Sequence, residues 1–179
     1  MLSINNPQPT TPMTALEESI MATEAEKRER LLKVFNIGMY GMIKGLWDLF
    51  GESSFATVHS VGERILTTME KENGLKIEGD SPEAILLNLV HVLRDEVGTM
   101  SEGQVEVQED GRVSLACQNC FLREATCWLE AEGVQPFACL PMNIGAAAMR
   151  KRLGTRHRLL GRDWEPQTQT CTIKFALIE

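Results

Sequence analysis

The sequence predicts an α+β fold, in which N-terminal helices are followed by a mostly antiparallel sheet with inserted helices. Apolar residues recur at three- and four-residue steps through the first part of the chain, which is the period of amphipathic helices. From about residue 104 the period changes to two, which is the period of half-buried strands. Helices that precede strands in this way are typical of the α+β class.

The length and composition favour one domain. The chain has 179 residues, of which 43% are hydrophobic and 24% charged, as in ordinary globular proteins. We expect residues 1–14 to be a disordered tail, since this segment is polar, contains several prolines and has little to bury. Residues 15–179 are expected to form a single domain, with a helical part over residues 15–100 and a sheet that carries a cysteine site over residues 101–179.

The charge is unevenly distributed along the chain. Residues 1–116 hold 19 acidic and 10 basic residues, a net charge of −9, whereas residues 117–179 hold 6 and 8, a net charge of +2. A nucleic-acid-binding domain is usually basic throughout, so we expect no direct contact with nucleic acid. Six of the residues from 150 to 162 are Lys or Arg, which indicates either a solvated helix end or a local anion site.

The sequence also predicts where in the cell the protein is located. It contains no run of 18 apolar residues, and its N-terminus lacks the basic start and apolar stretch of a secretory signal. We therefore expect no membrane span and a cytoplasmic location. In a reducing compartment, clustered cysteines bind metals or act in redox chemistry more often than they form structural disulfides.

A long amphipathic helix is predicted to end at Gly51. Gly38, Gly41 and Gly45 recur along it, and glycine destabilises a helix, so we infer that another element or a partner subunit packs closely against that side. A kinked helix is the alternative. Its apolar positions are Leu31, Val34, Phe35, Met39, Met42, Ile43, Leu46 and Phe50.

Two shorter helices are predicted next. Ser53 or Ser54 is expected to cap the second helix, and Asn73-Gly74 is expected to end it. Residues 75–77 fit a short strand. A proline directly after Ser81 is a strong start signal for the third helix, which should extend to about Val97.

Alternating residues then predict a hairpin. Asp110-Gly111 is a turn signal, and the return strand ends at Cys117, whose side chain should face the apolar side of the sheet. The later predicted elements are helices over residues 121–132 and 140–153, a strand over residues 155–163, and a last strand that begins at Cys171.

All five cysteines lie in the last third of the chain. The spacing of Cys117 and Cys120 lets two thiolates bind one metal ion, as in zinc ribbons and iron–sulfur proteins, but no second pair has this spacing. Four soft ligands would select zinc or iron over calcium or magnesium. A redox dithiol and buried inert thiols are the alternatives, since free cysteine packs like a small hydrophobe. The remaining cysteines are Cys127, Cys139 and Cys171.

Several segments together carry a family resemblance. A hairpin that ends in a cysteine, a helix led by a cysteine and rich in Gly and Ala, an acidic residue, and a terminal strand with a cysteine follow one another. They are residues 110–117, residues 137–146, Trp164-Glu165 and residues 171–175. This order resembles the 4-vinyl-reductase domain family, also called hydrocarbon-binding, over about residues 28–178. That family is similar in turn to the Bet-type subunits of the TRAPP complex and to haem-based nitric-oxide sensors.

The resemblance implies a domain that binds small, mostly apolar molecules and is often dimeric through its N-terminal helices. In members that act as aromatic sensors, cysteines and a glutamate hold a zinc ion. Cys139, Glu165 and Cys171 match three such ligands, whereas the cysteine that usually follows the glutamate is absent from residues 166–170. The fourth ligand then comes from Cys117, Cys120 or Cys127, or the site holds something other than zinc.

These observations lead to a functional hypothesis. We interpret the chain as a small-molecule-binding or sensing protein, a homodimer with a zinc ion or an iron–sulfur cluster held by cysteines. The bound ligand would be small and apolar or anionic, and Trp128, Phe137 and Trp164 are candidates to line its pocket, unless they are ordinary core residues. The alternatives are an iron–sulfur or thiol redox protein, a reductase-like enzyme of tetrapyrrole metabolism, and a scaffold with inert cysteines.

Overall fold

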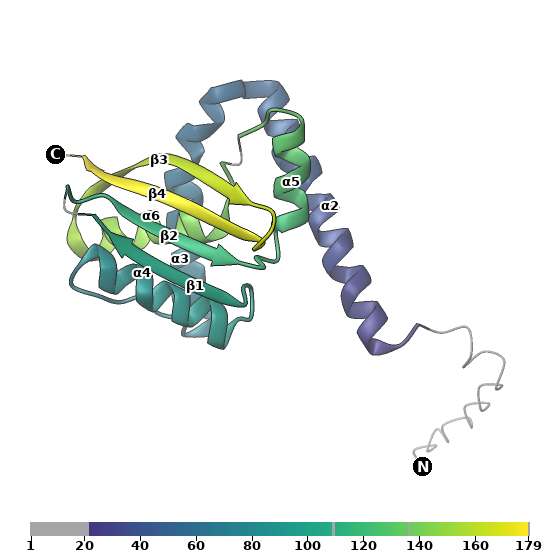
Figure 1. Ribbon diagram of the computed structural model, residues 1–179, viewed down its shortest axis with the longest axis horizontal. Coiled ribbons are helices and arrows are strands. Elements are labelled where there is room, and N and C mark those ends of the chain that lie inside the picture. Colours follow the sequence, from purple (N-terminus) through teal and green to yellow (C-terminus); the bar gives the residue numbers. More distant parts are fainter. Residues whose placement is uncertain (1–21, 109, 136, 179) are drawn as a thin grey trace, which may run out of the picture.

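The structure, a computed structural model, describes residues 22–108, 110–135 and 137–178 (Figure 1). The predicted tail over residues 1–14 lies outside these residues. Within them the α+β fold is confirmed, because the helices come first and the strands follow with two helices inserted. The helices and helical turns are α2 (Glu24–Phe50), η1 (Gly51–Thr57), α3 (Val58–Asn73), α4 (Pro82–His91), η2 (Val92–Glu96), α5 (Arg123–Ala131) and α6 (Leu140–Leu153). The strands are β1 (Glu102–Val107), β2 (Val113–Gln118), β3 (Arg156–Glu165) and β4 (Thr170–Ile178).

The strands form one antiparallel sheet in the order β1-β2-β4-β3. Helices α4 and α6 cover one face of this sheet, and α3 packs against α6 (Figure 1). The covered face carries the buried strand residues, and the other face carries charged residues such as Lys174, which pairs with Asp163. This division agrees with the alternation that the sequence predicted. The buried strand residues include Val113, Leu115, Cys117, Cys171, Ile173 and Phe175.

Helix α2 is the longest element, and it packs on the body through α5 and η1. Asn36 makes the central contact, because its buried amide donates to the carbonyl of Phe121 at 2.8 Å and accepts from the N–H of Ala125 at 3.1 Å. The helix ends at Gly51, as predicted. Among the described residues, no helix, α2 included, is both long and apolar enough to cross a membrane.

Two local predictions were wrong. Neither Ser53 nor Ser54 caps α3, because residues 51–57 form a 3-10 turn and the hydroxyl of Ser54 donates to the carbonyl of Leu46 instead. Residues 75–77 form no strand, although the Ile77 side chain is fully buried. The Ser54 hydroxyl, which the local pattern assigned to a helix cap, instead bonds a carbonyl of α2. The Ile77 side chain, which the pattern assigned to a strand, is buried in the core without one.

The close approach of α3 to α6 depends on Gly62. A Cβ atom at this position would lie 2.2 Å from the carbonyl oxygen of Asn143 and 2.9 Å from its carbonyl carbon. Helix α6 begins directly after Cys139, so this contact also sets where the start of α6 lies relative to the sheet.

We expect Gly62→Ala to destabilise the protein by about 1–3 kcal/mol, because the new methyl group meets backbone atoms that cannot rotate away. The free energy of unfolding from urea titration measures this loss. Ser60→Ala, at an exposed position of the same helix, is the matched control and should change the free energy by less than about 0.5 kcal/mol. Equal stability of both variants would show that α3 and α6 do not touch at Gly62.

Candidate metal centre

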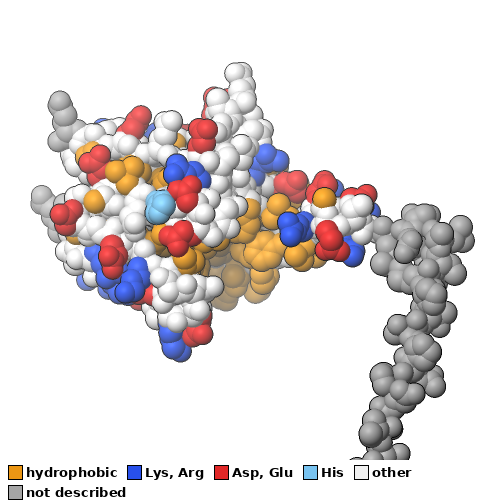
Figure 2. All heavy atoms as spheres, turned by 90° about the horizontal axis from the view of Figure 1, so that it is seen from below, with side chains coloured by type: hydrophobic (Ala, Val, Ile, Leu, Met, Phe, Trp, Pro, Cys, Tyr) orange, Lys and Arg blue, Asp and Glu red, His pale blue; other side chains and the backbone are white. Residues whose placement is uncertain are grey.

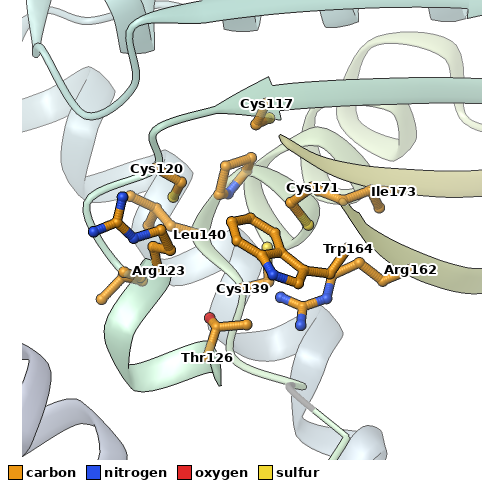
Figure 3. A pocket seen from close by; sticks show the side chains of 12 residues that line it. Cys117, Cys120, Arg123, Thr126, Cys139, Leu140, Arg162, Trp164, Cys171 and Ile173 are labelled. Atoms are coloured by element: carbon orange, nitrogen blue, oxygen red, sulfur yellow. The ribbon is translucent and has the colours of Figure 1, made fainter. Parts of the chain in front are cut away.

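Four of the five cysteines line one small cavity at the end of the sheet. Cys117, Cys120, Cys139 and Cys171 all border it, and its volume is about 20 Å³. A void of this size holds about one water molecule or one ion. Figure 3 shows these side chains around a shared space that Trp164 and Arg162 also border.

The strand register brings two of these cysteines together. Cys117 on β2 lies directly opposite Cys171 on β4, and Trp164 on β3 lies opposite Cys171 on its other side. Paired residues on adjacent antiparallel strands have Cβ atoms about 4.5–5.5 Å apart, so the two thiols share one face of the sheet.

Cys120 reaches the cavity through a tight turn after β2. Asn119 adopts a positive φ of 50°, a left-handed conformation that asparagine tolerates better than most residues. Its backbone N–H donates to the carbonyl of Gln169 at 3.1 Å, and this bond ties the turn to the loop before β4. The carbonyl of Cys120 then accepts from the N–H of Arg123, at the start of α5.

Cys139 stands at the N-cap position of α6. Its carbonyl accepts the first backbone hydrogen bond of the helix, from the N–H of Asn143 at 3.0 Å. Pro141 in the first turn favours a helix start at this point. The partial positive charge of a helix N-terminus favours a thiolate, so this position suits a cysteine that ligates a metal ion.

Burial makes the four thiols weak acids. It raises the pKa of Cys117 far above the ordinary value and also raises the pKa of Cys120. Burial, with Cys171 and Cys120 nearby, raises the pKa of Cys139 to about 12. Burial also raises the pKa of Cys171 to about 11, although Arg162 acts in the opposite direction. Without a metal ion, the cavity therefore holds neutral thiols at neutral pH.

Arg162 is a buried cation at this site. Its side chain is only 8% exposed, and it forms an ion pair with Glu130. Among the described residues its Nε atom is buried without a hydrogen-bond partner. Burial alone would lower the pKa of Arg162, but Cys171 and Glu130 raise it, so the guanidinium remains charged. A buried donor without an acceptor is costly, and a thiolate in the cavity would supply the missing acceptor.

A larger hollow adjoins the cavity on the other side of Arg162. Its volume is about 380 Å³, which lies within the range of small-molecule sites. Arg162 and Glu130 contribute polar groups to its wall. The apolar part of the wall comes from Phe55, Val134, Met142, Leu159 and Leu160.

The structure brings together some of the predicted site residues and leaves others apart. Cys127 is not among the residues that border the cavity. Glu165 pairs with Thr170 on the opposite face of the sheet from Cys171, so strand alternation directs it away from the thiols. Trp128 packs edge-on against Tyr40, and Phe137 packs against Phe55 in a separate core cluster. Of the three predicted aromatic residues, Trp164 alone borders the cysteines.

Two arginines were missed as site residues. Arg123 and Arg162 both border the cavity, although the sequence placed Arg162 only within a basic stretch that fits a solvated helix end or an anion site. A signal was present in the sequence: Arg162 is two residues before Trp164, so both face the same side of β3. Two other members of that stretch, Lys151 and Arg152, pair with Glu70 beside the end of α6.

The four cysteines suit a metal ion in two respects: thiolates are good ligands for soft metals, and the four side chains border one cavity. At the separations in the structure, however, no three of the described His, Cys, Asp and Glu side chains already form a group that could hold a metal ion. Thiols without a metal are neutral and need not point at a common centre. The orphaned Nε of Arg162 and the single-ion volume of the cavity are the observations that favour a fit.

Comparison with known families places most of the chain in one of them. Residues 32–175 match the family described as "Putative rubredoxin C-terminal domain" (RdxA_C). The match covers the greater part of the chain and includes all five cysteines. No curated protein matches the chain.

We expect the metal-free, reduced protein to lose stability above about pH 9. A thiol whose pKa is raised by folding stabilises the fold fully below its unfolded value, near 8.5–9, and this contribution is lost as the pH rises through the folded value. For Cys171 the loss between pH 9 and 11 should be on the order of 2–3 kcal/mol.

Free energies of unfolding at pH 8 and pH 10.5 measure this effect. Cys171→Ala should reduce the fall, and Cys127→Ala, which alters a thiol outside the cavity, should reduce it much less. If both variants keep the full alkaline fall, the cavity thiols are not its source.

Proposed function

Because the chain belongs to the rubredoxin C-terminal domain family RdxA_C, we propose that it binds a single metal ion through Cys117, Cys120, Cys139 and Cys171. The observation that carries this proposal is that four cysteines from three separate segments of the chain border one cavity of about 20 Å³. Cysteines that serve only as packing residues need not lie around one cavity, because a single cysteine packs well in any apolar surroundings.

The chemistry of the donor atoms limits which metal ions could bind. Four thiolates select iron or zinc, and the rubredoxin name of the family favours iron. The volume of the cavity suits one ion better than a cluster of several iron and sulfide atoms. When bound, iron in a set of four thiolates would supply one-electron exchange, so a redox function is the first candidate. Zinc would make the same site structural.

The charges around the cavity also support a thiolate site. Four thiolates and one divalent cation carry a net charge of −2, and the two arginines that border the cavity offset part of it, since Arg162 is also paired with Glu130. Glu130 holds Arg162 in place from the outer side. Buried anionic sites need such partners, because an uncompensated charge is costly in a low-dielectric interior.

Ligand sensing is a second candidate, and the hollow of about 380 Å³ favours it. Arg162 borders both this hollow and the cysteine cavity. A small anionic or apolar ligand bound there would contact the same side chain that stabilises the thiolates. The resemblance to the 4-vinyl-reductase domain family, which implies a zinc-containing sensor, is in line with this second candidate.

We expect the anaerobically prepared protein to contain one iron or zinc ion per chain, and each of Cys117→Ser, Cys120→Ser, Cys139→Ser and Cys171→Ser to lose most of it. Cys127→Ser is the matched control and should keep the metal, because Cys127 does not border the cavity. Elemental analysis gives the stoichiometry, and circular dichroism shows whether each variant is folded. Absorption in the visible region distinguishes iron from zinc.

Two results would reject the proposal. One is a metal content near zero after expression with added iron or zinc. The other is the loss of metal from Cys127→Ser as complete as that from the four cavity variants. A protein that holds several iron atoms with sulfide would replace the single ion by a cluster.

A further inference from the structure

Two residues beside the cysteine cavity have an unfavourable backbone conformation. Asn119 and Gln169 adopt positive φ angles of 50° and 55°, and among the described residues no other residue except glycine does so. Asparagine tolerates this left-handed region, whereas glutamine seldom adopts it, because its Cβ atom lies too close to the backbone. A strained residue persists only where its surroundings hold it, and such residues cluster at functional sites. Gln169 is therefore a candidate functional residue near the cavity.

Hydrogen bonds hold Gln169 in this conformation. Its side-chain oxygen accepts from the guanidinium of Arg123, and its side-chain nitrogen donates to the carbonyl of Pro166 at 3.0 Å. Its backbone carbonyl accepts from the N–H of Asn119 at 3.1 Å. We call the bonds of Gln169 to Arg123 and Asn119 the latch. The latch joins the turn before β4 to the turn after β2 and to the start of α5.

The latch connects two sides of the cysteine cavity. Arg123 borders the cavity and comes three residues after Cys120. Gln169 comes two residues before Cys171. Figure 3 shows Cys120 and Arg123 on one side of the shared space and Cys171 on the other. The bond between Arg123 and Gln169 therefore links the two segments that carry these cysteines.

An ion needs an opening movement to reach the cavity. The volume of about 20 Å³ holds one bare ion, whereas an ion with its shell of water molecules is larger. The core holds most of the walls in place, since Cys117 and Ile173 lie in paired strands and Pro141 lies in the buried first turn of α6. The turns that the latch joins depend on exposed hydrogen bonds, such as the bond from the Gln118 side chain to the carbonyl of Thr168. Segments held in this way open locally at a small cost in free energy.

The hydrogen-bond partner of Arg123 in the latch is uncharged. On the face of the molecule in Figure 2, basic side chains lie next to acidic ones. Unlike Arg162, which pairs with Glu130, Arg123 forms no ion pair among the described residues, and its bond is to the neutral amide of Gln169. A neutral acceptor binds a guanidinium more weakly than a carboxylate does, so this bond is released more easily. Until it is released, the charge of Arg123 repels a cation at the cavity.

We propose that Gln169 controls access to the cysteine cavity. The intact latch keeps the cavity closed, and release of Gln169 lets the two turns separate and the Arg123 side chain turn away. The strain at Gln169 favours release, because the residue returns to an ordinary backbone conformation once its bonds are broken. Metal uptake by this route rests on the proposed function, whereas access itself can be measured in the metal-free protein.

Alkylation by iodoacetamide tests the proposal in the reduced, metal-free, full chain. A buried thiol reacts only when its surroundings open, so the labelling rate of Cys120, followed by peptide mass spectrometry, measures the opening. Gln169→Ala removes the side-chain bonds and keeps the strain. This variant should label Cys120 about tenfold faster, which is the factor for one hydrogen bond to a charged group. Gln167→Ala is the matched control, because the Gln167 side chain forms no hydrogen bond among the described residues, and it should change the rate by less than about twofold.

Two further variants separate local opening from other causes. Ile85→Val weakens the core at a residue of α4 that does not border the cavity, so it should speed the labelling of Cys120 less than Gln169→Ala does. Gln169→Gly lacks the same side-chain bonds but adopts a positive φ without strain, so it should label more slowly than Gln169→Ala. Circular dichroism shows whether each variant is folded.

The proposal is overturned if Gln169→Ala labels Cys120 no faster than the native chain, or no faster than Ile85→Val. Equal rates for Gln169→Ala and Gln169→Gly would overturn the role of the strain. In the metal-loaded protein, Gln169→Ala should release the ion to a chelator about tenfold faster at unchanged metal content. A chain that opens as expected but binds no metal would support the access proposal and reject the metal site, so the two failures are distinguishable.

Discussion

The antiparallel register of β2, β4 and β3 is the constraint on which the candidate site depends. Cys117 faces Cys171 across one strand pair, and Trp164 faces Cys171 across the next. A slip of one residue would turn every one of these side chains to the open face. The covered face of the sheet is buried by α4 and α6, so the register that buries Leu115, Ile173 and Phe175 is also the one that buries the thiols.

The helices complete the site from the other side. Gly62 lets α3 approach α6 closely, and α6 starts at Cys139, so the packing of two helices sets the position of a ligand candidate. The turn at Asn119 likewise sets the position of Cys120. The four cysteines are therefore placed by parts of the fold that are separately determined, and their convergence is the strongest sign that the site has a function.

Arg162 links the two hollows at this end of the molecule. It borders the cysteine cavity, carries an orphaned Nε, and forms part of the wall of the larger hollow beside Glu130. A ligand or ion bound in either hollow would therefore contact this side chain.

The sequence by itself determined the class and order of the elements. The hairpin turn at Asp110-Gly111, the start of α4 at Ser81 and the full extent of α6 were all predicted, because turn, cap and periodicity signals are local. The inward face of Cys117 followed from alternation alone.

Only the tertiary structure decided which of these residues meet. The position of Cys127 outside the cavity, the turn of Glu165 to the open face, and the inclusion of Arg123 and Arg162 depend on strand order and helix docking. The physical reason is that local patterns fix the direction of a side chain within its own element. The distance between elements is set by close packing over the whole core, which no single stretch of sequence encodes.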